Sequence, residues 1–264
     1  MPSGTLRPWI PLLVAALLAA PAGAEALDEA LYARLLERHT REVPDAARTR
    51  VDYAGLAGSA DWRRLIANVG HTRPDALADR DARLAYWINV YNILTIDLVL
   101  QHYPVDGIRD IGHLLRPVWK RPAGRIAGRR YSLDEIEQRI LRPLGEPRIH
   151  AAIVCASVSC PALRREPFAT SQLDAQLDAA LRGWLANPEK GLRIDRTTGT
   201  LWLSRIFKWF EEDFEARGGV IPFIAPHLGD GDRAWLDRHG AGASIEYLDY
   251  DWSLNDLARA PAHR

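Results

Sequence analysis

The 264-residue sequence lacks several features that would identify a class of protein directly. It has no excess charge of one sign, since 34 Lys and Arg residues balance 34 Asp and Glu residues, and it has no basic block. Charge-driven binding to nucleic acid or to anionic lipid is therefore not expected. No self-similarity with a period of roughly 20 to 50 residues is visible, which argues against repeat architectures.

Metal-ligand and cofactor motifs are also missing. The eight histidines are scattered, with no His-x-x-x-His pair, and no Cys-x-x-Cys occurs. Such pairs are typical of zinc sites. No glycine-rich loop follows an expected strand, so a nucleotide cofactor is not indicated. We therefore expect neither a metal nor a cofactor.

The longest apolar run lies at the N-terminus. Arg7 precedes an apolar run from Trp9 to Ala20, and Ala22-Gly23-Ala24 follows it. This pattern predicts a cleaved secretory signal at residues 1–24. No later stretch approaches the roughly 20 apolar residues that a membrane span needs. We expect an exported protein, periplasmic or extracellular, with no stable membrane span after signal cleavage.

The hydrophobic pattern predicts an α+β fold in which helices pack on a mainly antiparallel sheet, in a single domain. Residues 25–79 are expected to form a helical lead-in, residues 80–256 the main domain and residues 257–264 a tail. The expected helices span 26–41, 81–103, 132–142, 171–186, 204–214, 221–228 and 233–239. The expected strands span 51–53, 149–156, 192–195, 200–203 and 245–248, the third and fourth forming a hairpin.

Cysteine is scarce, and both cysteines fall in one apolar stretch that begins at Ile149 and includes His150. In a strand over 149–156, His150 and Cys155 would lie on opposite faces. Pro161 is suited to the first position of a helix, so Cys160 would be the N-cap, where the helix dipole favours the thiolate. These features predict Cys160 as a nucleophile with His150 as its base.

The same two cysteines are equally compatible with a disulfide, which is common in exported proteins. The enclosed loop is short, so the entropic stabilisation would be only about 2 kcal/mol. His150 would then be a hydrogen-bonded structural residue. The residues themselves leave both interpretations open.

Two asparagines, Asn89 and Asn92, lie on the expected helix 81–103. On a helical wheel the only polar strip consists of Arg83, Tyr86, Asp97 and Gln101. Asn92 falls away from this strip, and a buried amide needs hydrogen-bond partners. We expect Asn92 to bind backbone ends of neighbouring strands; the alternative is that it orients His150 or donates to an oxyanion.

A mixed aromatic and charged segment follows at residues 206–213. Lys208 and Glu212 are four residues apart and are expected to pair on a solvated helix face. The alternative is a ligand groove lined by Lys208 and Trp209. Most of the nine tryptophans are expected in the core, but a surface near Trp209 and Trp252 is a candidate binding site.

Five blocks in this chain together resemble the family called domain of unknown function 547, over about residues 80–256. The blocks are Tyr86–Asn92, Leu133–Glu137, Arg148–Pro161, Leu203–Phe210 and Tyr250–Asn255. The family pattern usually has histidine after the Ile136-Glu137 pair, where this chain has Gln138. If that histidine is the family's base, the resemblance implies that activity here is impaired or depends on His150. The family also occurs in proteins that work inside cells, which implies that the thiols can be free.

Two functions are consistent with the sequence. The first is a thiol-dependent hydrolase or acyl transferase acting on an amide or ester, with Cys160, His150 and Asn92 as catalytic residues. The second is a non-catalytic module that binds an unknown small-molecule or cell-envelope ligand or a protein partner, with a Cys155–Cys160 disulfide. The expected binding residues are Asn89, Cys155, Glu137, Lys208, Trp209 and Trp252.

Overall fold

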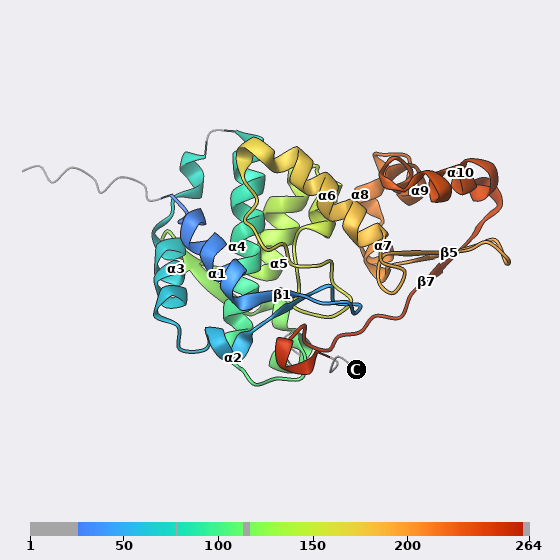
Figure 1. Ribbon diagram of the computed structural model, residues 1–264. Helices are drawn as coiled ribbons and strands as arrows, with labels where there is room; N and C mark the ends of the chain where they lie inside the picture. Colours follow the sequence, from blue (N-terminus) through green and yellow to red (C-terminus); the bar gives the residue numbers. More distant parts are fainter. Residues whose placement is uncertain (1–25, 78, 113–116, 261–264) are drawn as a thin grey trace, which may run out of the picture.

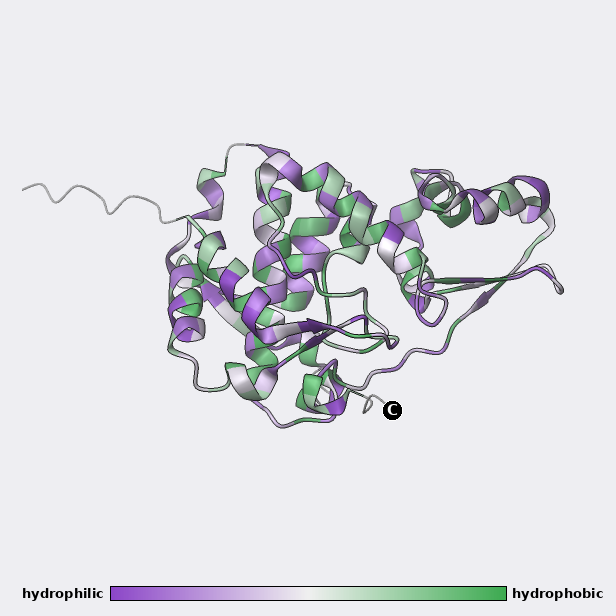
Figure 2. Cartoon of the chain, viewed as in Figure 1, coloured by the Kyte–Doolittle hydropathy of each residue, from purple (hydrophilic) through white to green (hydrophobic). Residues whose placement is uncertain are grey.

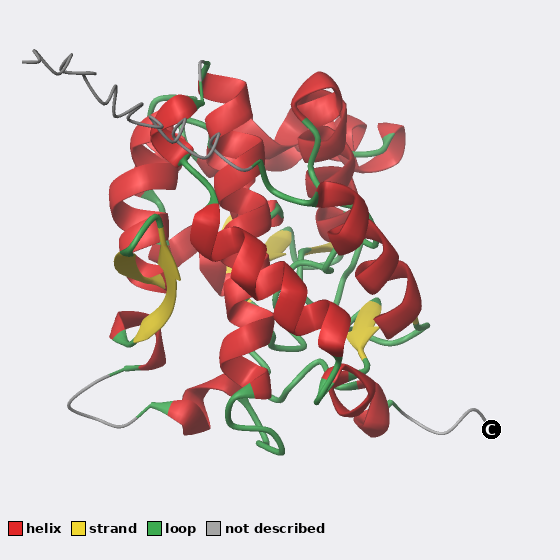
Figure 3. Ribbon diagram, turned by 90° about the vertical axis from the view of Figure 1, so that its left-hand side faces the viewer, coloured by secondary structure: helices red, strands yellow, loops and turns green. Residues whose placement is uncertain are grey.

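The computed structural model describes residues 26–77, 79–112 and 117–260. Helices dominate these residues, and the strands form only small sheets (Figure 3). The predicted α+β class is therefore confirmed. The predicted signal at 1–24 lies outside the described residues, within which no helix has the length and apolar character needed to cross a membrane.

The elements appear in Figure 1 in chain order. The helices are α1 (Glu29–His39), α2 (Tyr53–Leu56), α3 (Ala60–His71), α4 (Arg80–Leu100), α5 (Leu133–Ile136), α6 (Leu173–Leu185), α7 (Arg205–Trp209), α8 (Glu212–Glu215), α9 (Val220–Ile224) and α10 (Asp230–His239). The strands are β1 (Thr40–Glu42), β2 (Thr49–Val51), β3 (Pro122–Ile126), β4 (Arg129–Ser132), β5 (Leu192–Asp195), β6 (Thr200–Leu203) and β7 (Ser244–Tyr247).

Helix α4 is the centre of the larger of two hydrophobic clusters. The side chain of Asp79 caps it by accepting a hydrogen bond from the Ala82 N–H, and almost every residue from Leu84 to Val99 is buried. The predicted helix 81–103 is confirmed in position. Its predicted polar strip is wrong at Tyr86, which is buried because Thr72 supplies a hydrogen-bond partner for its hydroxyl.

The smaller hydrophobic cluster is built from the C-terminal half of α6, the β5–β6 hairpin and helices α7 to α10. Helix α6 joins the two clusters, since Leu177 packs in the larger one and Leu181 and Trp184 pack in the smaller one. Figure 2 shows hydrophobic and hydrophilic residues alternating along these helices, as expected for elements that bury one face.

The strands of the described ranges pair in three small sheets rather than one. β1 with β2, β3 with β4 and β5 with β6 are antiparallel, and β7 lies parallel to β6. The β5–β6 hairpin has the predicted bounds, and its turn contains Gly199 at a φ of 71°, a conformation that glycine adopts readily. The predicted strand at 245–248 is confirmed within one residue by β7.

The strand predicted at residues 51–53 overlaps β2 only at Val51, because β2 ends at that residue. Asp52 then caps α2, its side chain accepting a hydrogen bond from the Gly55 N–H. Tyr53 is therefore the first residue of a helix. A short apolar run does not by itself distinguish a strand from a helix, which explains the error.

The predicted strand at 149–156 is wrong. Residues Pro147–Ala151 form a 3₁₀ turn, η6, and the chain then runs irregularly. The Val154 N–H donates to Asn92 Oδ1 at 2.8 Å, so a side chain satisfies the backbone group that a neighbouring strand would otherwise pair with. Ala156 has a φ of 63°, a left-handed conformation that also interrupts an extended strand.

The helix predicted to begin at Pro161 is absent, and residues 161–169 are irregular. The Cys160 N–H donates to the Ser157 carbonyl at 3.2 Å, closing a turn directly before the proline. Cys160 is therefore not the N-cap of a helix, and the predicted dipole effect on its thiol is wrong.

The C-terminal segment returns from the smaller cluster to the larger one (Figure 1). The Tyr53 hydroxyl donates to Asn255 Oδ1 at 2.8 Å, and Leu254 forms an isolated β-bridge with Ser157. These contacts place residues 250–255 beside the loop that contains the cysteines.

Candidate functional site

A pocket of about 360 Å³ lies where the two hydrophobic clusters meet. Its volume and its mostly apolar lining, with a few polar groups, are typical of a small-molecule site. The lining residues are Tyr91, Pro117, Trp119, Lys120, Asp134, Glu137, Gln138, His150, Ile153, Cys155, Cys160, Ile206, Trp209, Phe210, Tyr250 and Trp252. Each of the five blocks that carry the family resemblance supplies at least one of these residues.

His150 is held in the pocket wall by an acidic partner and an aromatic ring. Its Nε2 lies 2.7 Å from Asp213 Oδ2, and its ring stacks on Phe210 with centroids 4.2 Å apart. Burial lowers the pKa of His150, although Asp213 acts in the opposite direction. The imidazole is therefore neutral near pH 7, with the Nε2 proton donated to Asp213 and Nδ1 left unprotonated.

Arg142 fixes Asp213 from the other side. Its guanidinium donates to both carboxylate oxygens, with Nε to Oδ2 at 2.7 Å and Nη2 to Oδ1 at 2.8 Å. Burial by itself would raise the pKa of Asp213, but the hydrogen bonds from His150 and Arg142 lower it to about 2. Asp213 is therefore ionised throughout the physiological range and orients the imidazole.

Glu137 faces His150 from a π-helical segment, Glu137–Leu141, that continues α5. Its Oε1 lies 3.9 Å from His150 Nδ1, and its Oε2 accepts a weak hydrogen bond from the Tyr91 hydroxyl at 3.5 Å. Burial raises the pKa of Glu137 from 4.5 to about 7, while Arg142 opposes the rise. The carboxyl can therefore exchange a proton near neutral pH, as a general acid or base must.

Aromatic side chains form a further part of the pocket wall. Trp209 is 45% exposed, and its ring lies 5.6 Å from that of Trp252 and 4.8 Å from that of Tyr250. Trp119 meets Trp252 edge to face at 5.6 Å. Such a wall can bind the flat face of a ring or planar group.

Lys208 does not line this pocket, and the predicted pairing with Glu212 is wrong. Its Nζ lies 5.2 Å from the centre of the Tyr247 ring, and Glu212 instead approaches Arg142 at 3.7 Å. Of the residues predicted to bind a ligand, Glu137, Cys155, Trp209 and Trp252 line the pocket, whereas Asn89 and Lys208 do not. Lys120, rather than Lys208, brings a cationic side chain to the pocket.

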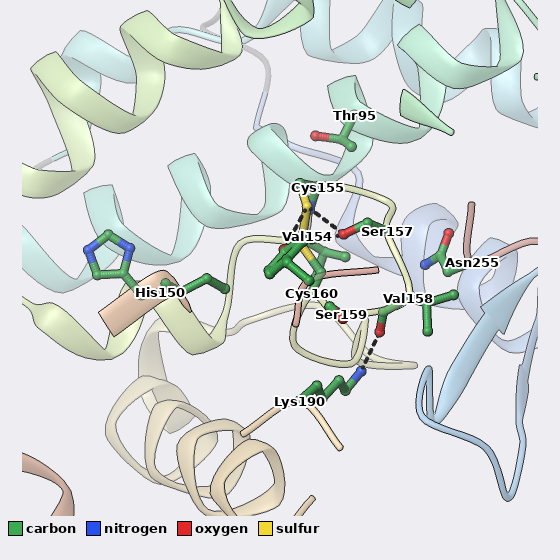
Figure 4. The surroundings of a disulfide bond; sticks show 12 residues. Thr95, His150, Val154, Cys155, Ser157, Val158, Ser159, Cys160, Lys190 and Asn255 are labelled. Carbon is green, nitrogen blue, oxygen red and sulfur yellow. Dashed lines mark hydrogen bonds between the residues drawn. A yellow bond between two sulfur atoms is a disulfide. The ribbon is translucent and has the colours of Figure 1, made fainter. Parts of the chain in front are cut away.

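Cys155 and Cys160 form a disulfide in the pocket wall (Figure 4). Their Cα atoms are 6.1 Å apart, within the usual range for a bridge. The predicted nucleophile Cys160 is therefore oxidised and buried, and its predicted role as a free thiol is wrong in this state. The alternative prediction of a Cys155–Cys160 disulfide is confirmed.

The two predicted asparagines bind backbone groups of neighbouring segments. Asn92 Nδ2 donates to the Ala152 carbonyl at 3.0 Å and Asn89 Nδ2 donates to the Phe168 carbonyl at 2.8 Å, and each Oδ1 accepts a backbone N–H. Neither side chain lines the pocket. Asn92 thus has the expected structural role, although its partners lie in irregular chain rather than at strand ends. No hydrogen bond joins Asn92 to His150 among these contacts.

Sequence reasoning missed several residues of the site. Asp213 belongs to the acidic end of segment 206–213, but no local signal links it to His150. Tyr250 stands in a block that the family resemblance includes. Arg142 and Trp119 carry no motif, so only the fold identifies them. Gln138, which replaces the family's usual histidine, lines the pocket and accepts a hydrogen bond from Arg142.

No group of three or more His, Cys, Asp or Glu side chains that could hold a metal ion occurs in the described part of the chain. Behind the pocket wall, Asp213 instead lies between His150 and Arg142 and binds both side chains. The site offers proton-transfer groups and an aromatic wall.

A comparison with known protein families agrees with the resemblance. Residues 74–185 match the family described as "Protein of unknown function, DUF547", so the predicted resemblance is confirmed over this segment. The blocks at 203–210 and 250–255 lie outside the matched residues, yet both line the pocket.

A curated relative is the avirulence protein ATR5 of Hyaloperonospora arabidopsidis (strain Emoy2). It is 31% identical over 101 residues, which cover 33% of this chain and 27% of that protein. The chain therefore spans about a quarter of the length of this relative. No solved structure matches the chain.

Proposed function

We propose that the pocket is the active site of a hydrolase that cleaves an amide or ester, with water rather than cysteine as the nucleophile. The observation that carries this proposal is the alignment of Glu137, His150 and Asp213. Glu137 Oε1 lies 3.9 Å from His150 Nδ1, and His150 Nε2 lies 2.7 Å from Asp213. The arrangement joins a carboxyl that titrates near pH 7 to an imidazole whose tautomer is fixed.

In the proposed reaction, a water molecule transfers a proton to ionised Glu137 while the oxygen of that water attacks the carbonyl carbon of the substrate. Protonated Glu137 is stabilised by donating a hydrogen bond to Nδ1 of neutral His150, after a small approach of the two side chains. The same proton then passes to the leaving amine or alcohol as its bond to carbon breaks. A pKa of about 7 suits Glu137 to both transfers. Lys120, which lines the same pocket, is the cationic residue assigned to stabilise the developing oxyanion.

The disulfide leaves water, rather than cysteine, as the nucleophile. Cys160 has no thiolate to offer while it is bonded to Cys155. The predicted reaction class, hydrolysis of an amide or ester, is retained, and the thiol dependence is replaced by dependence on Glu137. Acyl transfer to an alcohol or amine in place of water would use the same groups.

The test uses chromogenic aryl esters and anilides, whose flat leaving groups fit the aromatic wall. We expect Glu137→Gln to lower kcat/KM by about 100-fold or more, since general acid–base groups contribute about 10² to 10⁴. The control, Glu135→Gln, changes a carboxyl two residues away that pairs with Arg129. Its kcat/KM should stay within about twofold of the wild type. Hydrolysis no faster than in buffer, or equal activity of the wild type and Glu137→Gln, would refute the proposal.

A second candidate function is non-catalytic binding of an envelope ligand. The stacked pair of exposed Trp209 and half-buried Trp252 favours it, because such rings bind sugars and other planar groups. Titration with soluble peptidoglycan fragments should quench tryptophan fluorescence in the wild type and not in Trp209→Ala. Unchanged fluorescence in both would remove this candidate.

Export of the protein remains part of the proposal. The disulfide supports it, because thiols in the cytosol are kept reduced. Expression of the full chain in bacteria, followed by mass analysis of the periplasmic fraction, should give a product that begins at Glu25. An uncleaved product confined to the cytoplasm would contradict export.

A further inference from the structure

The disulfide is placed unsymmetrically in the pocket. Cys155 is partly exposed, whereas Cys160 is 3% exposed, although both contribute to the wall. A molecule that enters the pocket therefore reaches the sulfur of Cys155 more readily than that of Cys160. The bridge joins residues five apart, so it closes a loop too short for a large entropic stabilisation.

Hydrogen-bond donors converge on the buried sulfur. The Cys155 N–H donates to Cys160 Sγ at 2.9 Å, and the Tyr250 hydroxyl donates to the same sulfur at 3.3 Å. Ser157 Oγ lies 3.1 Å and the Tyr250 oxygen 3.4 Å from Cys155 Sγ, so the Cys155 N–H is the contact that Cys160 alone receives. The Ser157 hydroxyl donates to the Tyr250 oxygen at 3.3 Å, which leaves the Tyr250 proton directed at the disulfide. Burial raises the pKa of Tyr250, so its hydroxyl stays protonated. Two donors of this kind stabilise a thiolate far more than a bonded disulfide sulfur.

We infer that Cys155–Cys160 is a redox-active disulfide that exchanges with small thiols entering the pocket. The inference goes beyond the proposed hydrolysis and uses neither Glu137 nor His150. It assigns a distinct role to each cysteine: Cys155 is the sulfur that is attacked, and Cys160 is the sulfur that leaves.

The exchange has two steps. A substrate thiolate attacks Cys155 Sγ, a new sulfur–sulfur bond forms, and the bond to Cys160 breaks. Cys160 leaves with the electron pair as a thiolate, held by the Cys155 N–H and the Tyr250 hydroxyl. A second substrate thiolate then attacks the substrate sulfur of the mixed disulfide and releases Cys155. Two thiols are oxidised to one disulfide, and the protein gains two electrons and two protons.

The test treats the folded protein with reduced glutathione in the absence of denaturant. Samples are quenched with N-ethylmaleimide at increasing times and analysed by intact mass and peptide mapping. We expect an early species with glutathione on Cys155 and N-ethylmaleimide on Cys160. Circular dichroism at the same glutathione concentration checks that the fold persists.

A matched pair of variants tests the donor to the leaving sulfur. Tyr250→Phe keeps the ring and removes the hydroxyl, and should slow formation of the mixed disulfide by about five- to tenfold. Tyr247→Phe removes a hydroxyl outside the pocket and should stay within about twofold of the wild type.

Three outcomes would overturn the inference. They are reduction that requires denaturant, glutathione attached mainly to Cys160, and equal rates for Tyr250→Phe and the wild type. If Tyr250→Phe does not fold, the attachment site in the wild-type protein decides. Because the assay follows sulfur chemistry alone, loss of esterase activity in Glu137→Gln has no bearing on it.

Discussion

The ionisation of Glu137 makes a quantitative prediction about stability. Its buried carboxyl faces Arg142, which favours ionisation, and Asp134 and Asp213, which oppose it. Burial dominates and raises the pKa from 4.5 in the unfolded chain to about 7 in the folded protein. Replacing the carboxyl by the neutral amide in Glu137→Gln removes this titration while keeping nearly the same shape.

The sign and size of the effect follow from proton linkage. Between pH 4.5 and 7 the folded protein binds more protons at Glu137 than the unfolded chain does, so stability falls as pH rises. Above pH 7 the carboxyl is ionised in both states and the full cost applies. At about 1.4 kcal/mol per pKa unit, the cost is about 3 kcal/mol.

The assay is urea unfolding followed by tryptophan fluorescence between pH 4.5 and 8. The quantity of interest is the free energy of unfolding of Glu137→Gln minus that of the wild type. This difference should increase by about 3 kcal/mol from pH 4.5 to pH 8. Other groups with altered pKa values, including His150 and Lys190, are present in both proteins, so their contributions largely cancel. Glu135→Gln is the control and should give a nearly constant difference. A change of less than about 1 kcal/mol for Glu137→Gln would show that burial does not hold this carboxyl near neutrality, and the acid–base role would lose its basis.

Three further predictions concern other residues. Asn92→Ala should lower the free energy of unfolding by about 3 kcal/mol, because two buried backbone groups lose their partners. The control is Gln101→Ala, at the exposed end of α4. A loss below about 1 kcal/mol for Asn92→Ala would contradict the structural role. Burial lowers the pKa of Lys190 to about 7, so the unfolded chain binds more protons above that value. The wild type should therefore gain about 2 kcal/mol of stability between pH 7 and 9 in urea unfolding. Lys190→Met should abolish this gain, and a gain retained by the variant would exclude Lys190 as its source. Gln138→His restores the histidine usual in the family to the pocket wall, and kcat/KM for aryl esters should rise at least about tenfold; an unchanged value would argue that position 138 takes no part in proton transfer.

Local signals in the sequence determined much of the secondary structure. Hydrophobic spacing located α4, and turn residues located the β5–β6 hairpin with its bounds. The side chain of Ser132 accepts a hydrogen bond from the Glu135 N–H at the start of α5, near where the sequence places a helix. Such features are predictable because caps and turns depend on residues within a few positions of one another. The stretch around the cysteines was also recognisable as unusual from its composition.

Only the tertiary structure decided what the residues of that stretch do. His150 is oriented by Asp213, which is 63 residues away, and Val154 is hydrogen-bonded by Asn92, which is 62 residues away. The backbone partners supplied by Asn92 are the reason that an apolar segment becomes an irregular loop instead of a strand. This loop brings the two cysteines within bonding distance and places them in the same pocket wall as Glu137. Contacts of this range depend on how α4, α6 and the C-terminal segment pack, and no periodicity or spacing in the sequence encodes that packing directly.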